Sequence, residues 1–96
     1  MLQQLTITTT DKAKLKPLVE SAIRRERQIL TLAIQRTRER LAEFEDQYDM
    51  SSTKFERRLN TGDLQETVEF TDWRMELGML RLLQSQQQAL EEARLD

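Results

Sequence analysis

A heptad repeat of mostly apolar residues constrains this chain most strongly. The repeat consists of Ile23, Leu30, Ile34, Thr37, Leu41, Phe44 and Tyr48. Alternate spacings of three and four residues place these side chains on one face of an α-helix. Between Pro17 and Gln47 there is neither a glycine nor a second proline to interrupt it. We therefore predict one long helical arm over residues 17–47.

Two competing signals bear on the start of this arm. Asp11 is a suitable helix cap, but Pro17 would then lie deep enough in the helix to require a kink. Proline costs no hydrogen bond in the first turn, so the predicted start is near Pro17. Residues 1–10 (MLQQLTITTT) form an N-terminal tail, either extended or a short strand, and residues 11–96 form the helical hairpin.

A second apolar stripe predicts another arm of similar length over residues 66–95. The stripe consists of Trp73, Leu77, Leu80, Leu83 and Leu90, while Met75, Met79 and Leu82 lie on a neighbouring face. Asp63 and Glu66 have the spacing of a capping box, and Thr71 with Asp72 offers a later start. Gly78 lies within this arm, where glycine weakens a helix by ~1 kcal/mol relative to alanine. A close contact between helices explains it, because a missing Cβ lets two backbones approach.

A short helix is predicted between the arms, over residues 52–60. Ser51, Ser52 or Thr53 can cap it, and Gly62 suits the left-handed conformation that often follows a last helical turn. Arms of equal length joined by a compact connection are typical of an antiparallel helical hairpin. The predicted fold is therefore all-α, a long antiparallel hairpin with a short connecting helix.

All the aromatic residues lie around the connection. They are Phe44, Tyr48, Phe55, Phe70 and Trp73. Where the arms of a hairpin diverge, large side chains are needed to fill the space, and aromatic rings remove a large area from water. The rings are expected to form one cluster that holds the connecting helix against both arms. The alternative is an exposed aromatic patch that binds a partner.

A two-helix hairpin buries only the seam between its helices, and this chain has apolar residues on further faces, including Ile29 and Leu32. The remaining apolar surface requires another chain to cover it. We predict a homodimer that forms a four-helix bundle. The residues expected in the core or the interface are Ile23, Leu30, Ile34, Leu41, Leu77, Leu80, Leu83 and Leu90.

The composition argues against catalysis and metal binding. There is no cysteine and no histidine, which removes thiolate ligands, the commonest general base and the commonest nitrogen ligand of zinc. The densest acidic run, Glu43 to Asp49, is typical of a solvated surface more than of a metal site. We expect no enzyme, no catalytic residue, no cofactor and no metal. Without an apolar run of ~18–20 residues or a signal peptide, a soluble cytoplasmic protein is expected.

Charge is divided unevenly along the chain. Residues 11–41 contain nine Lys or Arg and four Asp or Glu, whereas residues 42–96 contain six and thirteen. This division indicates either association with a charged partner or two antiparallel arms of complementary charge. The basic arm lacks the larger positive charge and the exposed aromatic residues that favour nucleic-acid binding, so nucleic acid is not a favoured partner.

The connection also carries a motif. It reads Phe44-x-x-x-Tyr48-x-Met50-Ser51-Ser52-x-x-Phe55, then Gly62-Asp63-Leu64 and Glu69-Phe70-x-Asp72-Trp73. In this motif, and in the leading ITTTDKAKLKPLVESAI, the chain resembles a family of small helical proteins of cyanobacteria and archaea. Asp63 stands where glutamate is common in the family. Members often appear encoded beside small toxin-like proteins, so the resemblance implies an antitoxin that binds and occludes a cognate toxin.

Two other functions remain open on the sequence alone. The chain is a homo-oligomeric helical scaffold if it has no toxin partner. It is a weak nucleic-acid-binding autoregulator if the basic arm contacts nucleic acid. A toxin-like neighbour would favour the antitoxin, and binding that falls steeply with salt would favour the autoregulator.

Overall fold

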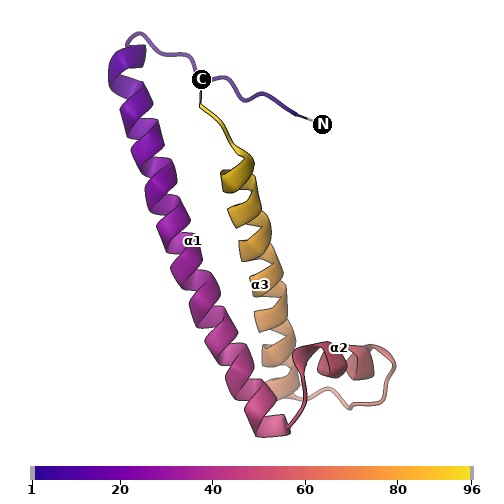
Figure 1. The fold of residues 1–96 in the computed structure, drawn as a ribbon. Coiled ribbons are helices and arrows are strands. Elements are labelled where there is room, and N and C mark those ends of the chain that lie inside the picture. Colours follow the sequence, from indigo (N-terminus) through magenta and orange to yellow (C-terminus); the bar gives the residue numbers. More distant parts are fainter. Residues whose placement is uncertain (1, 96) are drawn as a thin grey trace.

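A computed structural model describes residues 2–95, and within this range the chain forms three α-helices and no strand. Helix α1 spans Lys12–Tyr48, α2 spans Ser52–Asn60 and α3 spans Val68–Glu92. The long helices α1 and α3 run antiparallel and pack against each other, while α2 projects to the side at the closed end (Figure 1). The predicted all-α class and the hairpin-like pairing of two long helices are confirmed. No helix in the described range is long and apolar enough to cross a membrane.

Helix α1 begins earlier than predicted. The side chain of Asp11 accepts a hydrogen bond from the Lys14 backbone N–H at 3.1 Å and caps a helix that starts at Lys12. Pro17 therefore lies inside α1, and the prediction that the helix starts there is wrong. The proline removes one intrahelical hydrogen bond, to the Ala13 carbonyl. Both residues are exposed, so water can solvate that carbonyl, and the cap outweighs the loss.

At the closed end, hydrogen bonds connect α1 to α2. The residue after α1, Asp49, adopts a left-handed conformation with φ 48°. Ser51, one of three predicted caps, accepts a hydrogen bond from the Lys54 N–H at 3.1 Å. The carboxylate of Glu45, in the last turn of α1, accepts a hydrogen bond from the Ser52 N–H at 2.6 Å. These contacts fix the direction in which α2 leaves the hairpin.

Helix α3 is capped by Thr67, whose hydroxyl accepts a hydrogen bond from the Phe70 N–H at 3.1 Å. The predicted capping box of Asp63 and Glu66 is wrong. The Asp63 carboxylate instead accepts a hydrogen bond from Arg58 Nε at 2.8 Å, which closes the turn after α2. The helix starts at Val68, directly after its Thr67 cap.

Gly78 lies on an exposed part of α3, and no close helix contact accounts for it. A Cβ atom placed there would have no neighbouring atom within 4 Å, so the predicted close approach of two backbones is wrong. Glycine costs ~0.5–1 kcal/mol relative to alanine in a helix. We therefore expect Gly78→Ala to raise the free energy of unfolding by about that amount. Denaturant unfolding followed by circular dichroism measures the change, and a loss of stability would show that Gly78 has a packing role.

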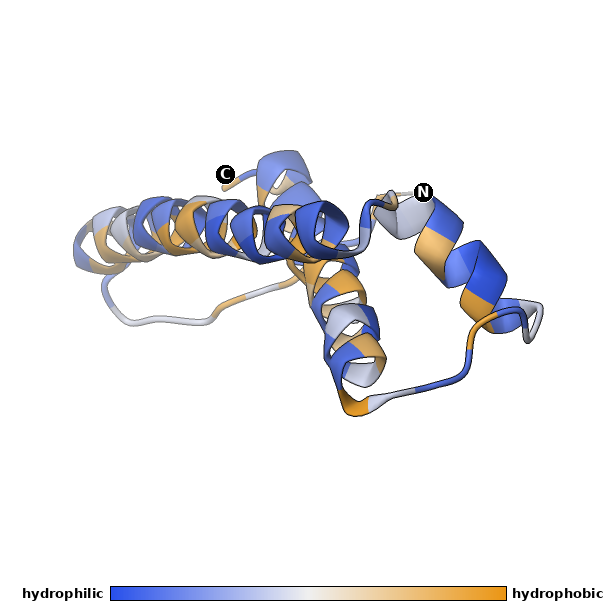
Figure 2. Ribbon diagram, turned by 90° about the horizontal axis from the view of Figure 1, so that it is seen from below, coloured by the Kyte–Doolittle hydropathy of each residue, from blue (hydrophilic) through white to orange (hydrophobic). Residues whose placement is uncertain are grey.

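The seam between α1 and α3 forms the core of the hairpin. Four of the predicted core or interface residues are buried there: Leu30, Ile34, Leu41 and Leu77. The other four are only half-buried: Ile23, Leu80, Leu83 and Leu90. Figure 2 shows polar and apolar residues along each helix, as expected for helices that bury one side only.

Polar contacts across the seam fix how α1 and α3 are aligned. Near the open end, Arg27 Nη2 donates to the Leu90 carbonyl at 2.8 Å. Towards the closed end, Arg40 Nη1 lies 3.2 Å from Glu76 Oε1. Residues around 27 are thus level with residues around 90, and residues around 40 are level with residues around 76.

Candidate partner-binding face

The five aromatic rings gather at the closed end and pack within the chain. Trp73 and Phe55 have no exposed surface. Their rings stack with centroids 3.9 Å apart, and the Phe44 ring stacks on Trp73 at 5.5 Å. Tyr48 and Phe70 meet edge to face at 5.0 Å and pack against the same cluster. The rings therefore hold α2 against both long helices, and the alternative of an exposed aromatic patch for a partner does not fit this geometry.

Polar contacts also attach α2 to α3. The Trp73 indole N–H donates to the Ser52 hydroxyl at 2.9 Å. Two guanidinium nitrogens of Arg81 donate to the Glu56 carboxylate, one of them at 2.8 Å. These hydrogen bonds, together with the positive charge of Arg81, hold the pKa of Glu56 below its usual value, although burial opposes the shift. Ionised Glu56 therefore stabilises the closed end.

Acid is expected to weaken this contact. A carboxyl group whose pKa is lowered by folding stabilises the fold above its unfolded pKa, about 4.3 for Glu, and the stabilisation is lost as the pH falls through the lower folded pKa. At pH 7, Glu56→Gln should reduce the free energy of unfolding by about 0.5–1 kcal/mol, as for a partly exposed ion pair. Urea unfolding should show this difference shrinking as the pH falls below about 4. Equal stability of the two proteins at pH 7 would contradict the role of Glu56.

Beyond their first turns, the two long helices leave six large apolar side chains exposed. They are Leu18, Ile29 and Leu32 on α1, and Met75, Met79 and Leu82 on α3. Their exposed fractions lie between 47% and 67%. Leu2, Leu5 and Ile7 of the tail and Val68 at the start of α3 are also exposed. The hairpin alone therefore leaves a large part of its apolar surface uncovered. Contact of this surface with water is unfavourable, at ~25 cal/mol per Å².

Four of these side chains, Leu18, Ile29, Met79 and Leu82, lie on one side of the hairpin. Ile29 and Met79 each come one position before a seam residue of their helix. In two antiparallel helices that face each other, the side chains just before the seam residues lie on the same side of the pair. The second helix is reversed both in chain direction and in the direction it faces, and the two reversals cancel. Arg40 and Glu76 hold equivalent positions, and their 3.2 Å contact marks that side. Leu18 and Leu82 follow further round each helix. Leu32 and Met75 each lie midway between two buried seam residues, so they point away from the partner helix at the two edges of this side. We call this surface, with its two edges, the apolar face.

Other features of the described surface are weaker candidates for a functional site. A shallow depression on the opposite side is lined mostly by polar residues, Thr31, Gln35, Arg38, Glu39 and Gln87. Within residues 2–95, no group of three or more acidic side chains is arranged to bind a metal ion. In the acidic run after residue 42, the Glu45 carboxylate binds the start of α2. The apolar face is therefore the strongest candidate for a functional surface.

The apolar face consists of residues other than those predicted for the core or interface. The predicted residues line the seam inside one chain, with Leu30 only 4% exposed and Leu77 only 8% exposed. The signal for the face is a second stripe on α3, in which Met75, Met79 and Leu82 keep spacings of four and three residues. The sequence places this stripe beside the seam, but only the pairing of α1 with α3 shows that the exposed residues of both helices share a side.

The motif that resembles the cyanobacterial and archaeal family lies at the closed end. Phe55 and Trp73 of the motif are core residues, and Gly62 adopts the left-handed conformation predicted for it, with φ 78°. The motif thus accounts for how the hairpin closes, and the apolar face lies outside it. Comparisons of the chain with protein-family models, with curated proteins and with solved structures find no match.

Proposed function

We propose that this chain is a non-enzymatic protein-interaction module that forms a homodimer through its apolar face. The observation that carries the proposal is the face itself, with four exposed apolar side chains on one side of a hairpin that buries only its seam and two more at the edges of that side. A second hairpin covers such a surface and completes a four-helix bundle. Full burial of a Leu or Met side chain contributes ~1.5–3 kcal/mol, so several of them offset the loss of free motion on association.

We further propose that the protein is an antitoxin, as its resemblance to that family implies. The physical support is an apolar anchor beside acidic segments at the closed end, which attract a basic partner and speed encounter. Neutralisation then works by occlusion, in which apolar side chains supply the affinity and charges at the rim select the partner. A homo-oligomeric scaffold uses the same face without a toxin.

Co-expression tests the antitoxin role. A small protein encoded beside this chain should stop growth when expressed alone, and growth should return when the chain is produced with it. The tagged chain should retain the small protein during purification. Met79→Glu, which charges the apolar face, should abolish both effects. Ser85→Glu is the matched control, because it adds the same charge to an exposed position of the same helix outside the face.

The scaffold function predicts a different outcome. Failure of the wild-type chain to restore growth, together with failure to retain the small protein, would reject the antitoxin role. A stable homodimer under the same conditions would then leave the scaffold as the function of the apolar face.

A further inference from the structure

We infer that the second copy lies antiparallel on the apolar face, so that the open end of one hairpin covers the closed end of the other. This inference rests on the proposed homodimer and adds the direction of its two chains. Two independent features of the hairpin carry it. They are the height of the exposed apolar side chains along the hairpin and the distribution of charge between its ends.

The exposed apolar side chains of α1 and α3 lie at different heights. Those of α1 belong to residues 18–32 and extend from the open end to the middle of the hairpin. Those of α3 belong to residues 75–82 and extend from the middle to the closed end, because Glu76 is level with Arg40. Each hairpin therefore has its exposed apolar side chains on the open-end half of α1 and on the closed-end half of α3.

Reversal of the second copy matches these halves. Its α1 then brings the segment from Leu18 to Ile29 to the height of Met75, Met79 and Leu82 of the first copy, so exposed apolar side chains of both copies lie at the same height. In a parallel pair, the second α1 presents residues 35–43 at that height. None of the large exposed apolar side chains of α1 lies in that segment. The parallel arrangement therefore offers these side chains of α3 no large exposed apolar residue of the second α1.

The charges of the two ends also favour reversal. The open-end segments, residues 11–27 and 83–95, contain seven Lys or Arg and five Asp or Glu. The closed end, residues 39–76 with α2 included, contains five Lys or Arg and eleven Asp or Glu. The open end is therefore positive and the closed end strongly negative. An antiparallel pair sets opposite charges against each other at both ends, whereas a parallel pair sets like charges together.

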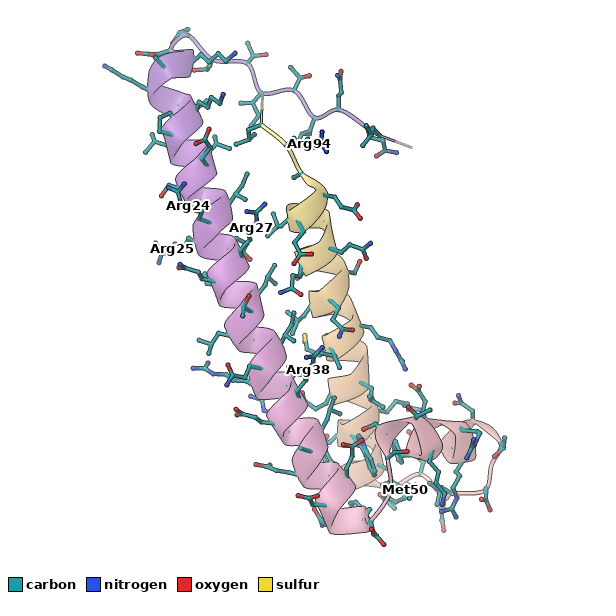
Figure 3. All side chains as sticks on the ribbon, viewed as in Figure 1. Arg24, Arg25, Arg27, Arg38, Met50 and Arg94 are labelled. Carbon is teal, nitrogen blue, oxygen red and sulfur yellow. The ribbon has the colours of Figure 1, made fainter. Side chains whose placement is uncertain are left out.

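Two arginines contribute to the positive charge of the open end. Arg24 and Arg25 extend from α1 on the side away from α3 (Figure 3). Within residues 2–95, neither forms an ion pair inside the hairpin. Arg27 behaves differently, because its guanidinium binds the Leu90 carbonyl. Arg24 and Arg25 therefore contribute positive charge to the open end that no ion pair within the described part of the hairpin neutralises.

Energy transfer between single-cysteine proteins tests the direction of the chains. The chain contains no cysteine, so Ala13→Cys and Gln47→Cys place one dye each near the open and the closed end of α1, at exposed positions. The two positions are about 50 Å apart in one copy at 1.5 Å per residue. Mixed dimers with a donor at 13 and an acceptor at 47 should transfer strongly. Dimers with both dyes at 13, or both at 47, should transfer weakly, and the reverse pattern would overturn the antiparallel arrangement.

Charge reversal gives an independent test, because it changes the dimer Kd in opposite directions in the antiparallel and the parallel arrangement. Arg24→Glu combined with Arg25→Glu should weaken an antiparallel dimer by roughly 3- to 10-fold in Kd at low salt, and salt should reduce the effect. In a parallel dimer the same change relieves repulsion between two positive ends and tightens binding. Tighter binding would therefore reject the inference. A wild-type chain that is monomeric in both experiments would reject the proposed homodimer itself, which separates the two failures.

Discussion

Trp73→Ala is expected to lower the free energy of unfolding by ~3–5 kcal/mol. The Trp73 side chain has no exposed surface, its ring stacks on Phe55 at 3.9 Å, and its indole N–H donates to Ser52. Removal leaves a cavity where α1, α2 and α3 meet and leaves a half-buried hydroxyl without its donor. Small domains are stable by only ~5–15 kcal/mol, so the loss threatens the fold itself. Urea unfolding followed by circular dichroism measures it.

Two further variants serve as controls for the Trp73→Ala result. Phe55→Leu removes less volume from the same cluster and should fold with a smaller loss of stability, which keeps the test informative if Trp73→Ala does not fold. Val68→Ala shortens an apolar side chain that is 80% exposed at the start of α3 and should change stability by less than ~0.5 kcal/mol. Wild-type stability of both Trp73→Ala and Phe55→Leu would show that the aromatic cluster is not part of the core.

Met79→Glu is expected to raise the dimer Kd by about 30-fold or more, while the helical content of the chain remains unchanged. Met79 is 47% exposed on the apolar face, so a charge there is solvated in the single hairpin and becomes desolvated only between two copies. A loss of ~2 kcal/mol is typical of a central interface residue, and this corresponds to the stated change in affinity. Sedimentation velocity over a concentration series measures the Kd.

Leu30→Glu provides the contrast, because it puts the same charge at a position that is 4% exposed in the seam. That variant should lose helical content as well as association, since an unpaired charge in the core of one hairpin destabilises the fold. Ser85→Glu, on the same helix as Met79 but outside the apolar face, should keep both. An unchanged Kd for Met79→Glu would place the interface elsewhere on the surface.

The seam could be predicted from the sequence because helical periodicity is a local property. Leu30, Ile34 and Leu41 follow spacings of three and four residues, and all three are buried. Periodicity does not reveal how well each position is covered. Ile23 and Leu90 lie near the open end and remain half-buried, because no connecting helix covers the seam at that end as α2 does at the closed end.

Helix ends and glycine were harder to predict because several signals competed there. The position preference of proline places Pro17 in the first turn, whereas the side chain of Asp11 caps the helix one full turn and more upstream. A close helix contact would explain Gly78, although nothing lies within 4 Å of a Cβ placed there. For Pro17 a local cap outweighs the preference, and for Gly78 the expected contact is absent.

The apolar face itself could be predicted only in part. The spacing of Met75, Met79 and Leu82 shows a second stripe on the later arm, and Ile29 and Leu32 show apolar residues outside the seam of the first. Whether these stripes share a side depends on which positions of the two helices meet. That information comes from long-range contacts such as Arg40 with Glu76, which join residues 36 positions apart.

The molar mass of the wild-type chain in solution, measured by light scattering at micromolar concentration, is the most direct test of association through the apolar face. A mass twice that of the single chain is expected, falling to that of one chain for Met79→Glu at the same concentration while the circular dichroism spectrum stays helical. A wild-type protein with the mass of one chain, compact and cooperative in its unfolding, would show that the hairpin is stable without a second copy and would contradict the homodimer.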